Sequence, residues 1–175
     1  MEGIRAIIFD WGRTLYDNDN NWLFPETKEV LEYCVQKYKL AVVSIAAQGE
    51  SEERFAKLSL LGIRHYFQIA LFSDKGSAAH EIAGFSLADT TQEMIDRIAF
   101  RQKMFLGRNA IGNLGVKPHE AVVVDDRARR IGWAIALGCK TIWIQKGKFA
   151  HELPNKETGH PTTTVKSLAE IMKFL

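Results

Sequence analysis

The sequence is poor in the features that mark several classes of protein. Its two cysteines, Cys34 and Cys139, lie far apart in unrelated contexts, which argues against a disulfide framework or a cysteine metal site. Lysine and arginine (23) nearly balance aspartate and glutamate (21), so the charge gives no reason to expect nucleic acid as a partner. No stretch approaches the roughly 20 apolar residues that span a bilayer. The apolar run at residues 6–9 is too short for a signal-peptide core, so we expect a cytoplasmic protein without a membrane partner.

What the chain does have is an alternation of strand-like and helix-like segments. Nearly continuous apolar runs, typical of strands buried on both faces, cover residues 4–9, 40–44, 66–72, 120–125 and 140–145. Amphipathic segments of helical length cover residues 25–38, 50–61, a stretch ending at residue 114, and 128–137. This alternation predicts a three-layer, Rossmann-like α/β fold, with a parallel sheet between two layers of helices, in one domain of residues 1–175.

Two segments depart from the alternation. Residues 73–97 are rich in small and polar side chains, and we interpret them as a small insertion with a short helix capped by Thr90 and Glu93. Near the C-terminus, Ser167 and Glu170 are spaced as the capping pair of a closing helix. Neither segment is long enough to suggest a second domain.

Polar side chains follow several of the predicted strands. Asp10 ends the first, Ser44 the second, and Asp125 with Asp126 the fourth. In open parallel sheets, ligands bind beyond the carboxyl ends of the strands, so these side chains are expected to converge on one crevice. Carboxylates supply the hard oxygen ligands of Mg²⁺, while a hydroxyl and a lysine can hold phosphate oxygens.

The order and spacing of these residues resemble the haloacid dehalogenase-like (HAD) hydrolase superfamily, in particular its cap-less magnesium-dependent phosphatases. The first motif of the superfamily, a strand followed by D-x-D-x-T, is similar to "DWGRT" at residues 10–14. "AVVS" matches the second motif at Ser44, and "VVVDD" matches the last at Asp125 and Asp126. We therefore expect a HAD-like fold with no full cap domain.

The superfamily's third motif is a lysine, and the sequence offers two candidates for it. Lys103 lies at a distance from the paired aspartates similar to that in the cap-less phosphatases, and we favour it. Lys75, in "FSDKGS" directly after a strand-like run, is the alternative.

The resemblance implies a phosphatase-like hydrolase. Asp10 would attack phosphorus and form an aspartyl phosphate, and Thr14 would orient the loop that carries it. Mg²⁺ would be bound by Asp10, by the backbone carbonyl of Gly12 and by Asp126, with Asp125 in support. The phosphoryl oxygens would be held by Ser44 and Lys103. An open crevice would admit a phosphorylated small molecule or a phosphoprotein as substrate.

Gly12 is the departure from the family pattern. The phosphatases of the superfamily have aspartate there, which protonates the leaving group and then activates water. General acid-base help contributes roughly 10² to 10⁴-fold to a rate, so alkyl phosphates should react slowly. Three interpretations remain: a hydrolase for substrates with good leaving groups, a dehalogenase or phosphonate hydrolase on the same fold, or a protein that binds phosphate or metal without turnover. The second is disfavoured because those enzymes generally use a cap, and residues 14–25 leave no room for the cap of the phosphonate hydrolases.

Overall fold

Parallel strands dominate the computed structural model of the chain, which describes residues 1–74, 92–156 and 158–175. Six described strands form one sheet in which every neighbouring pair is parallel. Their order across the sheet is β5 (Ile69–Asp74), β4 (Lys39–Ala46), β1 (Ala6–Phe9), β6 (Ala121–Asp125), β7 (Lys140–Ile144) and β8 (Thr163–Val165). From β1, the chain adds β4 and then β5 on one side of the sheet. It then returns to add β6, β7 and β8 on the other side, so the direction in which strands are added reverses between β1 and β6.

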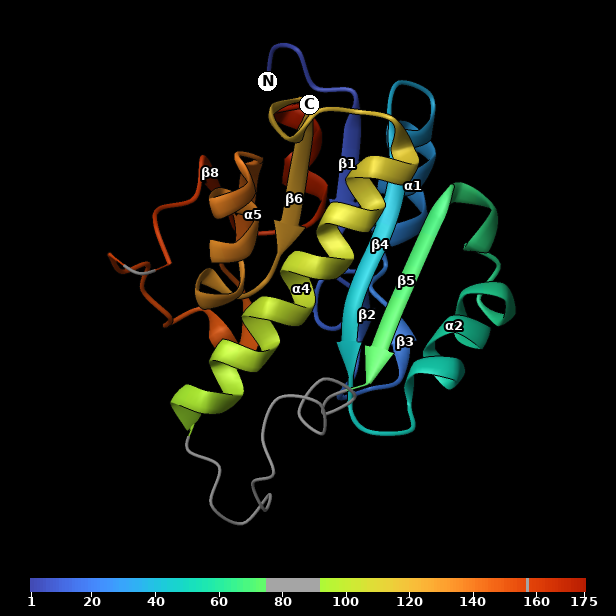
Figure 1. Ribbon diagram of the computed structural model, residues 1–175. Coiled ribbons are helices and arrows are strands. Elements are labelled where there is room, and N and C mark those ends of the chain that lie inside the picture. Colours follow the sequence, from blue (N-terminus) through green and yellow to red (C-terminus); the bar gives the residue numbers. More distant parts are fainter. Residues whose placement is uncertain (75–91, 157) are drawn as a thin grey trace.

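Helices cover both faces of this sheet. They are α1 (Thr27–Val35), α2 (Ser51–Leu60), α4 (Gln92–Leu114) and α5 (Gly132–Leu137). Short 3-10 turns occur at η1 (Arg64–Tyr66), η3 (Pro118–Glu120), η4 (Ala128–Arg130), η5 (Gly147–Phe149) and η6 (Ala169–Lys173). Figure 1 shows α4 and α5 in front of the strands and α1 behind them. Within the described part of the chain, no helix has both the length and the apolarity needed to cross a lipid bilayer.

The side chains of β1 alternate between two separate parts of the core. Ile7 and Phe9 pack with the residues that α1 and η6 bury, whereas Ala6 and Ile8 pack with those that α4 and α5 bury. All four are fully buried, as expected for a central strand with a helix layer on each face. The predicted three-layer α/β fold is thus confirmed.

Some predicted boundaries were wrong. β4 continues to Ala46, two residues past its predicted end at Ser44. The closing helix is only the 3-10 turn η6, and the predicted capping pair does not form, because Glu170 accepts a hydrogen bond from the backbone N–H of Lys166 (2.9 Å) and Leu168 holds the cap position. α5 ends at Leu137, the predicted end of the amphipathic segment 128–137, and the next residue, Gly138, has a φ of 86°, which glycine adopts without strain.

The proposed insertion at residues 73–97 lies mostly outside the described residues, which resume at residue 92. Thr90, of its predicted capping box, and Lys75 lie outside them as well. Residues 92–97 form the start of α4, which then continues without interruption to Leu114. Directly after the first motif, a short antiparallel pair of strands forms, β2 (Tyr16–Asp17) and β3 (Trp22–Leu23).

Candidate active site at the carboxyl ends of β1 and β6

The register of the sheet brings the predicted strand-end residues to one edge. Phe9 lies opposite both Val42 of β4 and Val124 of β6, so the residues that follow them stay level as the strands end. Asp10 and Asp125 come next in the two strands, and the N–H of Asp10 donates to the carbonyl of Val124 (2.9 Å). The chain changes direction between these two strands, and such a point is where open α/β sheets place their ligands.

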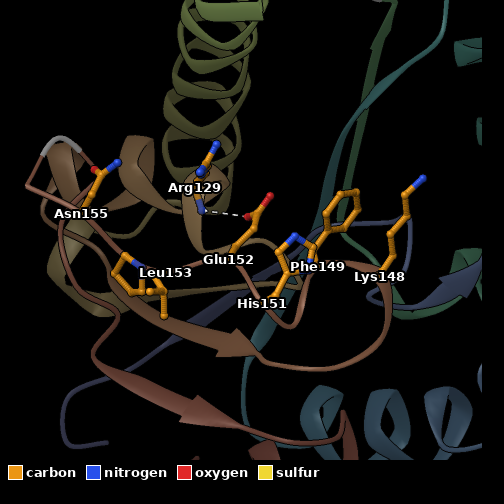
Figure 2. Close-up of a pocket in the computed structure, with 8 residues that line it drawn as sticks. Arg129, Lys148, Phe149, His151, Glu152, Leu153 and Asn155 are labelled. Carbon is orange, nitrogen blue, oxygen red and sulfur yellow. Dashed lines mark hydrogen bonds between the residues drawn. The ribbon is translucent and has the colours of Figure 1, made fainter.

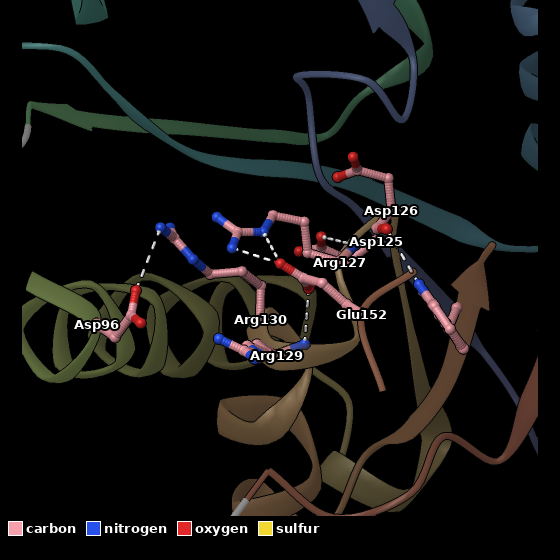
Figure 3. Close-up of polar contacts among 8 residues, drawn as sticks. Asp96, Asp125, Asp126, Arg127, Arg129, Arg130 and Glu152 are labelled. Carbon is pink, nitrogen blue, oxygen red and sulfur yellow. Dashed lines mark hydrogen bonds and ion pairs between the residues drawn. The ribbon is translucent and has the colours of Figure 1, made fainter. Parts of the chain in front are cut away.

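Three carboxylates gather at this point. Asp10, Asp125 and Asp126 are all buried, and each offers an oxygen within 4.8 Å of the oxygens of the other two. One oxygen of Asp125 accepts a hydrogen bond from the N–H of Arg127 (3.0 Å), and the indole N–H of Trp143 donates to the carbonyl of Asp126 (3.0 Å). The first bond orients the carboxyl group of Asp125, and the second fixes the backbone directly after β6 (Figure 3).

Lys103 reaches the cluster from α4. Its Nζ lies 2.5 Å from an oxygen of Asp10 and 3.1 Å from an oxygen of Asp125. The helix positions it through a regular stripe of residues that face the sheet, with Ala99 one turn before it and Leu106 one turn after it, both buried. The stripe packs on the same face of β1 as Ile8, two residues before Asp10, so helical and strand periodicity together bring the lysine to the carboxylate.

Burial controls the ionisation of the cluster. It raises the pKa of Asp10, and Lys103 opposes this rise. Burial also raises the pKa of Asp126 to about 9, and the negative charges of Asp125 and Asp10 act in the same direction. For Lys103, burial acts to lower the pKa of the ammonium, but Asp10 and Asp125 outweigh it and the pKa is raised. The lysine therefore stays charged, whereas Asp126 keeps its proton at neutral pH as long as no cation offsets the negative charges of its neighbours.

The donor set fits a hard divalent cation. Carboxylate oxygens are the preferred ligands of such ions, and three of them converge here from two strand ends. Among the described residues, Oδ2 of Asp126 is buried without any hydrogen-bond partner. A buried carboxylate oxygen without a partner is costly, and a bound cation would both satisfy it and stabilise all three carboxyl groups in their charged form.

The remaining predicted site residues lie around this cluster. Ser44 is buried in β4, two residues beyond Val42, which pairs with the end of β1. Thr14 is buried in the loop after Asp10, and its hydroxyl has no hydrogen-bond partner in the described part of the chain. The loop is tied to the start of α1, where the buried hydroxyl of Thr27 donates to the carbonyl of Leu15 (2.8 Å). The roles assigned to Ser44, Thr14 and the carbonyl of Gly12 stay predictions.

Arginines near the site are held by acidic partners. Nη2 of Arg127 and one oxygen of Glu152 lie 2.5 Å apart, and Arg13 pairs with Asp19 at 2.8 Å. Figure 3 also shows Arg130 turned toward Asp96 on α4, at 4.0 Å. Each of these arginines already has an acidic partner, so a substrate anion would have to compete with that partner for the arginine. Sequence analysis did not identify these acidic partners, of which Glu152 and Asp96 come from distant segments.

A cavity of about 580 Å³ adjoins the Arg127–Glu152 pair. Figure 2 shows Glu152 in its wall, with Arg129, Lys148 and Phe149 nearby. The guanidinium of Arg127 lies 4.1 Å from the centre of the Phe149 ring, which is a cation–π contact. Sequence reasoning missed this wall because residues 148–161 show neither helical nor strand periodicity. The one signal there was an acid followed directly by the apolar residues Leu153 and Pro154, in "HELP".

Comparison with known proteins shows what the sequence and the fold of this chain are similar to. Residues 102–171 match a family model described as HAD-hydrolase-like, and no curated protein sequence matches the chain. The L-2-haloacid dehalogenase RSc1362 has 13% identity and a TM-score of 0.69, with 98% of each chain covered. A Bacillus subtilis protein, YfnB, described as a HAD hydrolase bound to magnesium, has 13% identity and a TM-score of 0.64, again with 98% of each chain covered.

A third similar structure carries a different name. It is described as a predicted phosphoglycolate phosphatase from Haemophilus somnus 129pt, with 24% identity and a TM-score of 0.58. The match covers 87% of the present chain but 56% of that protein. At such identities, the solved structures establish a common fold and leave the reaction open. The chain is thus similar to haloacid dehalogenase-like hydrolases, both in the sequence of residues 102–171 and in its fold.

Proposed function

We propose that the protein is a magnesium-dependent, phosphatase-like hydrolase in which Asp10 is the nucleophile. The observation that carries this proposal is the buried group formed by Lys103 and the three carboxylates, with one oxygen of Asp126 unpaired among the described residues. A group of this kind is costly to bury for stability alone. It is well suited to hold a phosphoryl group between a cation, an ammonium and a carboxylate nucleophile.

Lys103 has the capacity to bind substrate while it holds the nucleophile. An ammonium has three N–H donors, and two of them are directed to Asp10 and Asp125. The third is available to a phosphoryl oxygen, as is the hydroxyl of Ser44 on the neighbouring strand. By offsetting the charge that surrounds Asp10, the lysine also allows an anionic substrate to approach.

The reaction proceeds in two displacements. In the first, an oxygen of Asp10 forms a bond to phosphorus while the bond from phosphorus to the leaving oxygen breaks, and the leaving group departs with the electron pair. In the second, water attacks phosphorus, the bond to Asp10 breaks, phosphate is released, and the proton of the water passes to solvent. When bound, Mg²⁺ would be held by Asp10, Asp126 and the carbonyl of Gly12, with Asp125 in support, and would stabilise negative charge on the phosphoryl oxygens.

Gly12 determines which substrates can react. No side chain at this position can give a proton to the departing oxygen, so the leaving group must be stable as an anion. Loss of general acid help costs roughly 10² to 10⁴-fold, and the loss grows with the basicity of the leaving group. Aryl and acyl phosphates are therefore the favoured substrate class among phosphorylated small molecules, and phosphoproteins with alkyl esters are disfavoured.

The test is phosphate release, in the presence of Mg²⁺, from aryl and acyl phosphates graded by the pKa of the leaving group. We expect kcat/KM to rise steeply as that pKa falls, and Asp10→Asn to abolish the activity because an amide cannot act as the nucleophile. Chloroacetate, assayed for chloride release, tests the dehalogenase alternative.

One result would overturn the proposal. If no phosphate ester reacts faster with the wild type than with Asp10→Asn, the protein is not a phosphatase. Binding of Mg²⁺ or inorganic phosphate without turnover would then support the second candidate, a binding or regulatory module. The replacement of the usual acid by Gly12 is the observation that keeps this candidate in view.

A further inference from the structure

The space beside Gly12 is filled by a side chain from another part of the loop. A Cβ atom placed on Gly12 would lie 2.9 Å from Oδ1 of Asn18 and 3.6 Å from its Nδ2. A contact of 2.9 Å is shorter than such a carbon tolerates, so a side chain at position 12 and the present position of Asn18 exclude each other. The amide of Asn18 thus lies against the point from which a side chain of residue 12 would extend.

The local structure holds Asn18 in this place. It lies in the turn between β2 and β3, where the carboxylate of Asp17 accepts hydrogen bonds from the N–H of Asp19 (2.9 Å) and the side chain of Asn20 (2.8 Å). Asp19 in turn pairs with Arg13, which follows Gly12 directly. Hydrogen bonds within the turn therefore stabilise its shape, and the Asp19–Arg13 ion pair holds it against the loop that follows Asp10.

The amide of Asn18 also lacks a partner that its position calls for. Its Oδ1 is buried and accepts no hydrogen bond from any residue that the structure describes. Buried amide oxygens are normally paired, so this one is expected to meet a group from outside the chain. An amide offers one acceptor and two N–H donors, but it has no proton that it can transfer at neutral pH.

We propose that Asn18 contacts the leaving group in place of the missing side chain of residue 12, and that it sets the preference for good leaving groups. This inference rests on the proposed function. As the bond from phosphorus to the leaving oxygen breaks, Nδ2 of Asn18 donates a hydrogen bond to the oxygen that gains the electron pair. In the second displacement, Oδ1 accepts a hydrogen bond from the attacking water and orients it. No proton is transferred to or from the amide in either step.

The first test replaces the amide by an acid of the same shape. Asn18→Asp is expected to raise kcat/KM for alkyl phosphates by at least about 10-fold, because it puts a proton donor where general acid help is missing. It should also flatten the dependence of log kcat/KM on leaving-group pKa. Asn18→Ala is expected to lower kcat/KM for aryl phosphates by roughly 10-fold and to steepen that dependence.

Asn21→Asp is the matched control. It makes the same chemical change in the same loop, at an exposed residue whose side-chain oxygen faces the hydroxyl of Tyr16 (3.5 Å). It should leave the leaving-group dependence at its wild-type slope. If Asn18→Asp and Asn18→Ala both keep the wild-type slope, or if Asn21→Asp changes it as much as Asn18→Asp does, the leaving-group role of Asn18 is wrong.

A second measurement tests the placement of Asn18 without using activity. Gly12→Ala should lower the melting temperature in the wild type but lower it less in an Asn18→Gly background, where the space beside residue 12 is open. Equal losses in the two backgrounds would overturn the placement.

Failure of the proposed function gives a different pattern. If the wild type is inactive but Asn18→Asp hydrolyses phosphate esters through Asp10, then the proposal of a wild-type phosphatase is wrong. The position of Asn18 at the acid site is then supported. If neither protein shows turnover that depends on Asp10, the proposed function and the leaving-group role fall together, whatever the melting temperatures show about placement.

Discussion

Two successive turns of α4 face the rest of the protein in opposite ways. Lys103 brings a buried charge to the carboxylates of Asp10 and Asp125. Gly107, one turn later, brings no side chain at all, because a Cβ there would lie 2.0 Å from a ring carbon of the buried Trp133. The first turn carries a charged group whose burial is costly, and the second has no room for a single methyl group. The same helix therefore serves the site through electrostatics and the core through close packing.

Removal of the charge of Lys103 should change stability and activity more than any other substitution in α4 considered below. Lys103→Met keeps the length of the side chain but leaves buried carboxylates without their cation, and breaking such a pair costs about 3–5 kcal/mol of stability. Activity should also be lost. Urea denaturation without metal, together with phosphate release, measures the two effects.

Mg²⁺ distinguishes an electrostatic loss from a packing loss. It should stabilise Lys103→Met more than the wild type, since the bound ion then takes over the role of the missing ammonium. Lys28→Met, at an exposed position of α1, should change stability little. Equal Mg²⁺ effects on the wild type and Lys103→Met would show that the lysine does not balance this cluster.

The second prediction concerns pH and Asp126. In the folded, metal-free protein its pKa is raised to about 9 from an ordinary 3.8, because the carboxyl group is buried beside other carboxylates. Between these values the folded state keeps a proton that the unfolded state has released, so the free energy of unfolding falls as pH rises. The effect is absent below about pH 4 and complete above about pH 9.

The melting temperature in EDTA should therefore fall between pH 5 and 9, and Asp126→Asn should flatten this slope. Added Mg²⁺ should stabilise the wild type more as pH rises, because metal and proton compete for the same oxygens. A metal-free melting temperature that rises with pH through this range would contradict the prediction.

Much of the fold could be predicted from the sequence because the signals were local. Apolar runs and helical periodicity gave the central strands and the layers, and strand ends pointed to Asp10 and Asp125 at one edge. The position of Lys103 was also within reach, since it continues an apolar stripe of α4 with Ala99 and Leu106. The distance to the aspartates along the chain was weaker evidence than this helical register.

What the sequence could not supply depends on contacts between distant or irregular segments. Glu152 is a buried acid only because the loop that carries it folds back onto Arg127. Asn18 fills the space at Gly12 only because the β2–β3 turn bends over the loop, and a glycine in the sequence does not say what covers it. Edge strand β8 is three residues long, too short for a pattern of alternation to appear.

The packing side of the comparison can be tested at Gly107. Gly107→Ala places a methyl group against Trp133, and the helix and the indole must shift to admit it. Such overpacking typically costs about 1–3 kcal/mol, which outweighs the gain in helix propensity. Urea denaturation measures the loss. A smaller loss from Gly107→Ala in a Trp133→Leu background than in the wild type would identify the indole as the cause. An equal loss in the two backgrounds would place the cause elsewhere.

Gly112 on the same helix offers the opposite and smallest effect. It is exposed, and a Cβ there would meet no atom within 4 Å among the described residues. Gly112→Ala should therefore stabilise the protein by about 0.5–1 kcal/mol, because alanine loses less backbone freedom than glycine when the helix forms. The same substitution thus changes sign within two turns of α4, and the sign depends on what faces each glycine. If both variants lost stability to the same extent, the loss would come from the helix itself and the contrast between its faces would be wrong.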